Sequence, residues 1–365
     1  MTRRWLAFAP IILMPLLLLS CRPQARPAIG KPPLPLVYLA ARSRESAFDR
    51  AALMWLGKDG RKRRLTPYLP ASKWFDTRVA PGGRTVAFEK ADRVYLVTLP
   101  GGALRVVQAP RDLYLTGTAG AGFAWHPAGE LLACALHHKR KATSGVALVD
   151  ARSARIKAYL QSARTHSYII RAIAWSPKGD RLAVASTGGL SIWTVDGRQQ
   201  RRLISTSMEG RAGALRGEVV CAISWSPDGG TLAFCVFREP AGVMELQVMR
   251  PDGSQRRRWG EHEGQPIVWS PDGRYLLHGR PPAGRRDHEL TCLDLRTGKP
   301  VPPIDGIASL WALDWSRSGN HMLAGQYTGD FQHRRYSTVM LDFPSGRQVV
   351  LLPPSQTSGP GAWVD

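Results

Sequence analysis

The chain has 365 residues, and its 50 Lys and Arg outnumber its 28 Asp and Glu, which gives a formal net charge of +22. None of its five cysteines belongs to a Cys-x-x-Cys pair, which argues against a zinc site or a redox motif of that kind. The sequence contains no Gly-x-Ser-x-Gly elbow, no phosphate-binding loop and no His-Glu-x-x-His, so the common signatures of hydrolases, nucleotide-binding proteins and zinc proteases are absent.

The first 20 residues have the pattern of an export signal. Arg3 and Arg4 form a charged start, and a short apolar stretch broken by two prolines follows. A membrane-spanning helix needs roughly 20 apolar residues, so a cleaved signal peptide is the better interpretation. The ending Leu-Leu-Ser-Cys, with Cys21 last, resembles the lipobox of bacterial lipoproteins. This resemblance implies cleavage before Cys21 and a lipid on its thiol; ordinary secretion with an incidental Cys21 is the alternative.

Three segments are therefore predicted. Residues 1–20 are a lipoprotein signal peptide, and residues 21–35, rich in Pro, Ala and Arg, are a semi-extended tether at about 3.1 Å per residue. Residues 36–365 form the folded domain. We expect an exported lipoprotein of the bacterial cell envelope, attached to a membrane through Cys21.

One short phrase returns six times in the remaining chain. Its best copies consist of Trp-Ser-Pro, Asp or Lys, and Gly, followed by an apolar strand, and the copies begin 46, 50, 50, 44 and 46 residues apart. A repeat of this length, built from short strands, is typical of a β-propeller. The copies begin at Val79, Trp125, Trp175, Trp225, Trp269 and Trp315.

Each repeat predicts four antiparallel strands, A to D, with large and small side chains in alternation. One face of a repeat carries large side chains such as Trp225 and Phe234, and the other carries small ones such as Ala222 and Ala233. Because side chains alternate between the two faces of a strand, each blade has a bulky face and a shallow face. We expect the bulky face of one blade to fill the shallow face of its neighbour.

The ends of the chain are predicted to share one blade. Residues 36–66 supply strands B, C and D but no strand A, and Trp363 lies one repeat period, 48 residues, after Trp315. The sequence therefore predicts an all-β, seven-bladed β-propeller whose first blade is closed by the C-terminal strand. A disordered tail after residue 360 is the alternative.

Two cysteines are predicted to meet across an A–B hairpin. Cys221 and Cys235 each lie seven residues from Asp228 in the turn. A disulfide between them is one possibility in an oxidising compartment, but neighbouring strands usually give poor geometry for one, which favours free thiols.

Many of the excess positive charges fall on C–D turns and outer D strands, where they would form a basic rim. Charged outer strands prevent edge-to-edge association, and they also attract polyanionic surfaces such as lipid headgroups or glycans. Both interpretations remain open. The rim residues are Arg61, Arg63, Arg64, Arg201, Arg202, Arg256, Arg257 and Arg258.

The B–C and D–A connections should lie together on the other face, which we call the long-loop face. Irregular loops on a rigid scaffold are where binding sites usually lie, so this face is our expected partner site. We assign no catalytic residue, no metal ligand and no cofactor. The candidate binding residues are His137, His138, Arg140, Arg280, Arg285, Arg286, Arg334 and Arg335.

The repeats, with Trp-Ser-Pro-Asp-Gly followed by Leu-Ala and an Arg-Arg-Leu strand D, resemble the TolB-type propeller family. The WD-repeat family is less similar, because its Gly-His and Trp-Asp marks are not in register. The resemblance covers roughly residues 36–365. It implies a periplasmic propeller that binds an envelope protein, although about 15 residues after Cys21 leave no room for the α/β domain that precedes the TolB propeller.

Three functions follow as hypotheses. The first is a monomeric, lipid-anchored, non-catalytic propeller that binds an envelope protein or peptide. The second is a binder of anionic glycan or lipid through the basic rim, and the third is a metal-dependent lyase or hydrolase of a polyanionic sugar. Nucleic acid is not expected as a partner, because an exported lipoprotein rarely meets it.

Overall fold

The structure is a computed structural model, and it describes most of the chain after residue 28. Cys21, Arg140, Arg285, Arg286 and Arg334 lie outside the described residues, as does the whole predicted signal peptide. The described residues are 29–41, 50–70, 74–90, 93–116, 123–139, 144–161, 169–197, 200–208, 215–239, 243–263, 266–281, 289–302, 304, 307–308, 310–328, 335–357 and 361–364.

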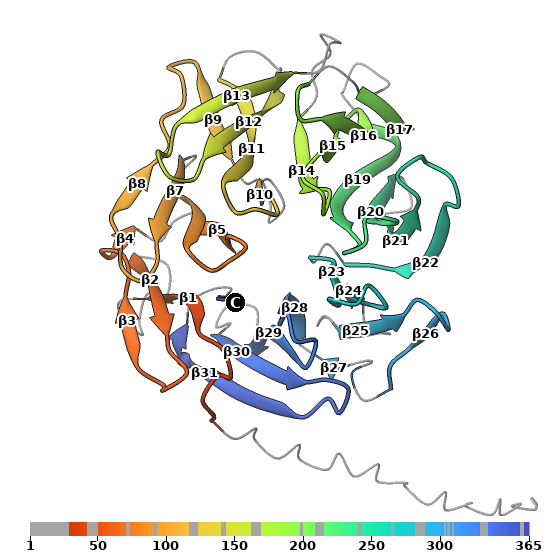
Figure 1. Cartoon of the computed structure of the whole chain (residues 1–365). Coiled ribbons are helices and arrows are strands. Elements are labelled where there is room, and N and C mark those ends of the chain that lie inside the picture. Colours follow the sequence, from red (N-terminus) through yellow and green to blue (C-terminus); the bar gives the residue numbers. More distant parts are fainter. Residues whose placement is uncertain are drawn as a thin grey trace, which may run out of the picture.

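Seven small antiparallel sheets stand in a ring around a central axis (Figure 1). This is the predicted all-β, seven-bladed β-propeller. The regular elements within the described ranges are strands. These ranges contain no helix that is long and apolar enough to cross a membrane.

The first three blades contain the following strands. Blade 1 consists of β1 (Leu36–Ala41), β2 (Arg50–Leu56), β3 (Lys62–Arg64), β4 (Leu69–Pro70) and the C-terminal β32 (Gly361–Trp363). Blade 2 consists of β5 (Trp74–Val79), β6 (Thr85–Lys90), β7 (Arg93–Thr98) and β8 (Leu104–Val106). Blade 3 consists of β9 (Leu113–Thr116), β10 (Phe123–Trp125), β11 (Leu131–His138), β12 (Ser144–Asp150) and β13 (Ile156–Gln161).

The remaining four blades follow in chain order. Blade 4 consists of β14 (Ile170–Trp175), β15 (Arg181–Ser186), β16 (Gly189–Thr194) and β17 (Gln200–Ser205). Blade 5 consists of β18 (Ser207–Met208), β19 (Leu215–Trp225), β20 (Leu232–Glu239), β21 (Val243–Met249) and β22 (Arg257–Glu261). Blade 6 consists of β23 (Val268–Trp269), β24 (Tyr275–Arg280), β25 (Glu289–Asp294), β26 (Lys299–Pro300) and β27 (Ile307–Ala308). Blade 7 consists of β28 (Leu310–Trp315), β29 (His321–Thr328), β30 (Arg335–Asp342) and β31 (Gln348–Thr357).

The C-terminal strand closes the ring, as the sequence predicts. β32 pairs antiparallel with β1, with Trp363 opposite Leu36, and it is the innermost strand of blade 1. Asp314 of β28, in the neighbouring blade 7, holds this strand in place, because its Oδ2 accepts a hydrogen bond of 3.0 Å from the Trp363 nitrogen. The Val364 nitrogen also donates to the Pro35 carbonyl oxygen at 2.8 Å, so the first and last segments of the propeller are joined directly.

The start of the described chain contacts the other side of the same junction. Ile29 forms a parallel β-bridge with Val350 of β31, and the Gly30 nitrogen donates to the Val350 carbonyl oxygen at 3.0 Å. Residues 29 and 30 belong to the predicted tether. They run along the outer strand of blade 7 before the chain enters blade 1 at β1 (Figure 1).

Each pair of neighbouring blades encloses its own hydrophobic cluster, seven in all within the described residues. Between blades 4 and 5, the small Ala183 and Ala185 meet the large Trp225 and Phe234. This confirms the predicted packing of a bulky face into a shallow one. A single blade would leave both of its apolar faces in water, so the stability of every blade depends on its two neighbours.

Three strand-A tryptophans add a polar link between neighbouring blades. Each indole Nε1 donates to the main-chain carbonyl oxygen of the residue before the corresponding position of the preceding blade. The bonds are Trp125 to Arg78 at 3.0 Å, Trp175 to Ala124 at 3.0 Å and Trp225 to Ala174 at 3.1 Å. The repeated Trp thus fills the interface with its ring and also fixes the position of the adjacent inner strand.

The repeated Ser-Pro-Asp-Gly builds a hydrogen-bonded turn. In blade 5 the Ser226 hydroxyl donates to the Asp228 carboxylate and accepts a hydrogen bond of 2.9 Å from the Thr231 nitrogen. The Gly229 nitrogen donates to the Ser226 carbonyl oxygen at 2.9 Å, and Gly229 has a φ of +73°, which favours glycine. The phrase recurs because every A–B hairpin needs this turn.

Removing the C-terminal strand is expected to destabilise the whole ring. Trp363 is 2% exposed, and truncation of a buried Trp costs about 3–5 kcal/mol. Deletion of residues 361–365, or Trp363→Ala, should therefore lower the midpoint of thermal unfolding strongly, and Asp314→Asn should lower it less. Tyr159→Ala, an aromatic truncation on the 47% exposed Tyr159, is the control. A deletion that costs no more than this control would contradict closure by β32.

Candidate functional site

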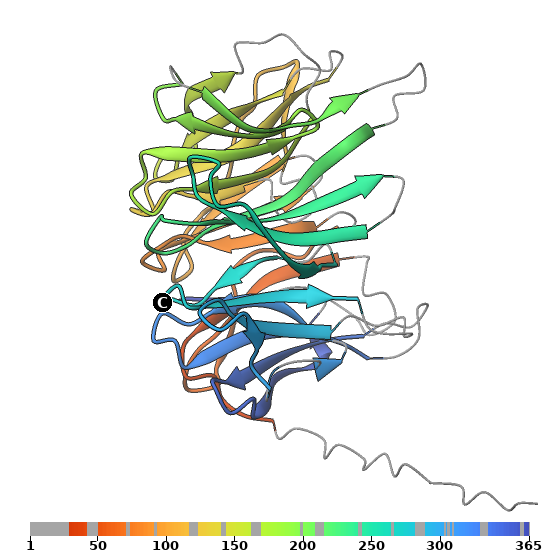
Figure 2. The same cartoon turned by 90° about the vertical axis from the view of Figure 1, so that its right-hand side faces the viewer.

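The two faces of the ring differ in their connections (Figure 2). A–B and C–D turns lie on one face, which we call the short-turn face, and the C-terminus marks it in Figure 2. B–C and D–A connections lie on the opposite, long-loop face. Most of the sequence of these longer connections lies outside the described residues, so the ends of the flanking strands define this face here.

Three blades are taller than their neighbours on the long-loop face. The B and C strands of blades 3, 5 and 7 have seven or eight residues, whereas those of blades 2, 4 and 6 have six. All of these B strands begin six or seven residues after the first residue of the repeat, so the additional residues extend the long-loop end. At 3.3 Å per residue, two additional residues raise a hairpin by roughly 7 Å.

Low blade 4 exposes an apolar side chain between tall blades 3 and 5. Ile169, directly before β14, is 52% exposed, and its carbonyl oxygen accepts a hydrogen bond of 3.0 Å from the nitrogen of Thr187, next to the tight B–C turn. An exposed Ile held by a short, hydrogen-bonded turn is suited to contact with a partner, because little conformational freedom is lost on binding.

The described candidate residues lie at strand ends on this face. His138 is the last residue of β11, Arg280 the last of β24 and Arg335 the first of β30. The Arg280 Nη2 donates to Glu289 Oε2 across blade 6 at 2.9 Å. These residues come from three different blades.

His137 is built into blade 3 and is not presented to solvent. It is 5% exposed, its Nδ1 is 2.8 Å from the Ser144 hydroxyl, and its ring stacks on Tyr114 with centroids 5.3 Å apart. Burial lowers the pKa of His137, because a charged imidazole loses its hydration there. The side chain is therefore neutral at pH 7, and His138 and Lys139 are the polar groups at the surface of this hairpin.

A cavity of about 580 Å³ lies beside this hairpin, at the seam of blades 2 and 3. Arg93, Arg111 and Lys139 line it together with Tyr114 and Gln108. The Lys139 Nζ donates to the Arg111 carbonyl oxygen at 2.8 Å, which fixes one cation at the rim of the cavity. Three cations that line one cavity suit an acidic side chain or another small anion. The sequence did not reveal this site, because its residues come from three separate elements with no motif.

The basic rim is exposed, but many of its arginines stabilise the fold. The Arg201 Nη2 donates to the Asp252 carbonyl oxygen in the C–D turn of the next blade at 2.8 Å. The same outer-strand position of blade 2, Arg105, donates to the Arg152 carbonyl oxygen of blade 3. Arg63 lies so close to Gly101 of the next turn that a Cβ there would collide with its guanidinium. Arginines of the outer strands thus contact the C–D turn of the following blade and stabilise the seam between the two blades.

Blade 5 contains a buried carboxylate that the rim neutralises. Glu245 is 5% exposed, and its oxygens lie 3.1 Å from Arg258 Nη2 and 3.4 Å from Arg238 Nε. Gln247 donates to Glu245 at 3.1 Å and accepts a hydrogen bond of 2.7 Å from Arg256 Nε. Arg256 and Arg258 of the basic rim therefore both take part in one buried hydrogen-bond network. Elsewhere on the rim, Arg61 is 3.4 Å from Asp59, and the guanidinium of Arg64 lies over Tyr68.

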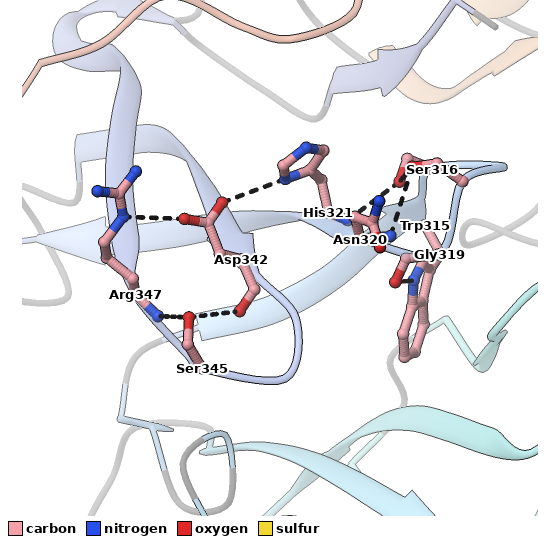
Figure 3. Close-up of polar contacts among 9 residues, drawn as sticks. Trp315, Ser316, Gly319, Asn320, His321, Asp342, Ser345 and Arg347 are labelled. Carbon is pink, nitrogen blue, oxygen red and sulfur yellow. Dashed lines mark hydrogen bonds and ion pairs between the residues drawn. The ribbon is translucent and has the colours of Figure 1, made fainter.

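Ser, His and Asp side chains also meet on the short-turn face of blade 7, without forming a catalytic triad (Figure 3). His321 Nδ1 is 3.1 Å from Asp342 Oδ1, and Arg347 Nε donates to Asp342 Oδ2 at 2.9 Å. The Ser316 hydroxyl accepts from the main-chain nitrogen of His321 at 3.1 Å, away from the imidazole. The hydroxyl therefore has no general base, and the network fixes two turns.

The described residues contain no group of three or more His, Cys, Asp or Glu that is arranged to hold a metal ion.

Comparisons with known proteins support a propeller repeat. Residues 158–194 match the family described as WD domain, G-beta repeat, which corresponds to most of β13 through the end of β16. This match is to the repeat family that the sequence motifs resemble less. A search of curated proteins with the sequence finds no significant match.

Solved structures with a similar fold have diverse activities. TolB from Acinetobacter baumannii has a TM-score of 0.50 and 11% identity, over 92% of this chain and 67% of that chain. Puromycin hydrolase has a TM-score of 0.62 and 18% identity over 92% of this chain, which spans 54% of the hydrolase. An oligogalacturonate lyase in complex with manganese has a TM-score of 0.52 and 14% identity, over 87% and 91% of the two chains. Identities this low show the fold alone.

The rim arginines are expected to differ in their effect on stability. Arg258→Ala should lower the free energy of unfolding by about 1 kcal/mol, because Glu245 loses one of its two cations while remaining buried. Arg257→Ala, one residue earlier on the opposite face of β22, should change it by less than about 0.5 kcal/mol. Urea unfolding measures both. In a Glu245→Gln background the Arg258→Ala effect should shrink, and an unchanged effect would show that Arg258 acts through another contact.

Proposed function

We propose that this chain is a lipid-anchored, non-catalytic propeller of the bacterial cell envelope that binds a protein or peptide partner on its long-loop face. The observation that carries the proposal is the difference in height between neighbouring blades on that face. The longer hairpins of blades 3 and 5 flank the shorter hairpin of blade 4, where Ile169 is exposed. The cation-lined cavity beside Lys139 adjoins the same hairpin of blade 3.

The chemistry of this face favours a partner with an apolar residue next to acidic ones. Ile169 offers an apolar contact, and Arg93, Arg111 and Lys139 offer positive charge one blade away. The hydroxyl and imidazole groups described above do not form a nucleophile with its base. The likenesses to TolB, to a hydrolase and to a lyase all concern the fold, so the residues of this chain carry the choice between a binding scaffold and an enzyme.

The basic rim supports the second candidate, an anionic glycan or lipid, to a smaller extent. Its arginines are exposed, yet Arg63, Arg201 and Arg258 already contact the protein itself. An arginine that is held by a carbonyl or carboxylate retains other N–H groups, so the rim keeps a general attraction for polyanions. We assign this attraction a supporting role in holding the propeller near an anionic surface.

The partner site is tested by capture from an envelope extract with residues 22–365, washed at low salt and then at about 0.5 M salt. We expect one protein to be retained at high salt by the wild type and lost with Ile169→Glu or Lys139→Glu. Tyr159→Glu and Arg257→Glu are matched controls on the rim and should retain it. Material that is lost as salt rises, and that depends on Arg257 rather than Ile169, would contradict the proposal and favour polyanion binding.

The anchor is tested by fractionation of cells that express the full chain. The wild type should be found in the membrane fraction and should incorporate a labelled fatty acid, because a diacylglyceryl group on Cys21 partitions into the bilayer. Cys21→Ser should lose the label and move to the soluble fraction, with Cys134→Ser as the control that keeps both. An unlabelled wild-type protein would contradict lipid anchoring.

A further inference from the structure

A β-bulge brings two cysteines together near the inner edge of blade 5. Along β19 and β20, Val220 pairs with Val236 and Ala222 pairs with Cys235, and the register shifts at the residue between them, Cys221. Two residues of a bulged strand oppose one residue of its partner. Cys221 and Ala222 therefore both lie opposite Cys235, unlike a pair of residues in an unbroken ladder.

The two sulfur atoms are in hydrogen-bond contact, and both thiols are free. The Cys221 thiol donates to the Val219 carbonyl oxygen at 3.5 Å, and its side chain is also a hydrogen-bond partner of Cys235. The Phe237 main-chain N–H also points to Cys221. Cys235 is fully buried between blades 5 and 6, whereas Cys221 is partly exposed. An external reagent therefore reaches Cys221 first.

Arg171 of β14 supplies a positive charge to Cys221 from the neighbouring blade. Arg171 and Cys221 each lie four residues before the strand-A tryptophan of their repeat, and both are the bulged residue of their hairpin. The Arg171 Nε is buried without a hydrogen-bond partner in the described part of the chain, as is expected of a group placed to face an anion.

These neighbours favour the thiolate of Cys221. The hydrogen bond with Cys235, opposed by partial burial and aided by the charge of Arg171, lowers the pKa of Cys221 to about 7. The same contact and burial raise the pKa of Cys235. The lowered pKa favours the thiolate of Cys221, and the thiolate is the form of cysteine that attacks a disulfide.

The other two cysteines within the blades are different in kind. Cys134 and Cys292 are both fully buried, and burial raises the pKa of Cys134. They have no second cysteine across a bulge. They serve as internal references for a thiol that is only packed.

We propose that Cys221 and Cys235 are a reactive thiol pair, in which Cys221 attacks an external disulfide and Cys235 closes an intramolecular disulfide. In the first step the Cys221 thiolate attacks one sulfur of RS–SR, which forms a Cys221–SR bond and releases RS⁻. In the second step Cys235 loses its proton to solvent and attacks the Cys221 sulfur, which releases the second RS⁻. Two protein thiols are oxidised to one disulfide, and one external disulfide is reduced to two thiols.

The product would join β19 to β20 at the bulge, next to Arg171 and towards the long-loop end of blade 5. The proposal does not depend on the proposed function, because it needs only a disulfide in the surrounding medium. It assigns this chain a covalent modification site that other blades lack, because only blade 5 has cysteine at both positions of the hairpin.

The test is a time course with oxidised glutathione at pH 7, followed by alkylation of the remaining thiols and peptide mass spectrometry. Cys221 and Cys235 lie on one tryptic peptide, residues 217–238, so the disulfide appears as an unalkylated peptide lighter by two hydrogens. We expect this product in the native protein while Cys134 and Cys292 remain unmodified. Cys235→Ser should stop the reaction at a stable glutathione adduct on Cys221, and Cys221→Ser should leave Cys235 unreacted.

Arg171→Gln should slow the first step several-fold at pH 7 and move the midpoint of Cys221 alkylation from near pH 7 towards about 8.5. Arg181→Gln, on the neighbouring strand of blade 4, is the control that should change neither. A glutathione adduct that persists on Cys221 in the wild type would overturn the pair. Cys221 that reacts no faster than Cys134 and Cys292 would overturn the reactive site as a whole.

Discussion

The complementarity between the two faces of each blade is the constraint on which the rest of this structure depends. A blade is a four-stranded sheet with apolar side chains on both sides, so it is stable only when a neighbour covers each side. Six blades in a row would still leave two uncovered faces. The ring removes both, and the strand that completes it, β32, is the last piece of the chain. Closure through Trp363 and Asp314 is therefore a condition for the burial of every other interface.

The polar groups follow from this arrangement. The buried indole N–H groups of Trp125, Trp175 and Trp225 find acceptors in carbonyl oxygens of the preceding blade. In the A–B turns of blades 4, 5 and 6, a serine hydroxyl donates to an aspartate carboxylate and accepts from a main-chain nitrogen of the same turn. On the outside, arginines such as Arg201 reach the turn of the next blade. Much of the positive charge of this chain thus has a structural use before any partner is considered.

Function is left to the positions that the repeat does not fix. The short-turn face is occupied by turns that every blade needs, whereas the long-loop face varies in height from blade to blade. Two departures from the repeat stand out. One is the low blade 4 with Ile169, which suits contact with another molecule. The other is the paired bulge residues Arg171 and Cys221, which place a cation beside a thiol in a position where other blades have neither function.

The sequence alone determined the number of blades, the strands within them and the closure by Trp363, because a repeat every 44 to 50 residues and the alternation of side chains leave one way to bury the apolar faces. It also placed Cys221 and Cys235 on facing strands. Only the tertiary structure decided which charges are used internally, as Glu245 with Arg258, and which side chains gather from separate elements, as Arg93, Arg111 and Lys139 do. Such contacts depend on how neighbouring blades are rotated and on single-residue bulges. Neither leaves a periodic signal in the chain, so the sequence predicted the scaffold and left its particular sites to the fold.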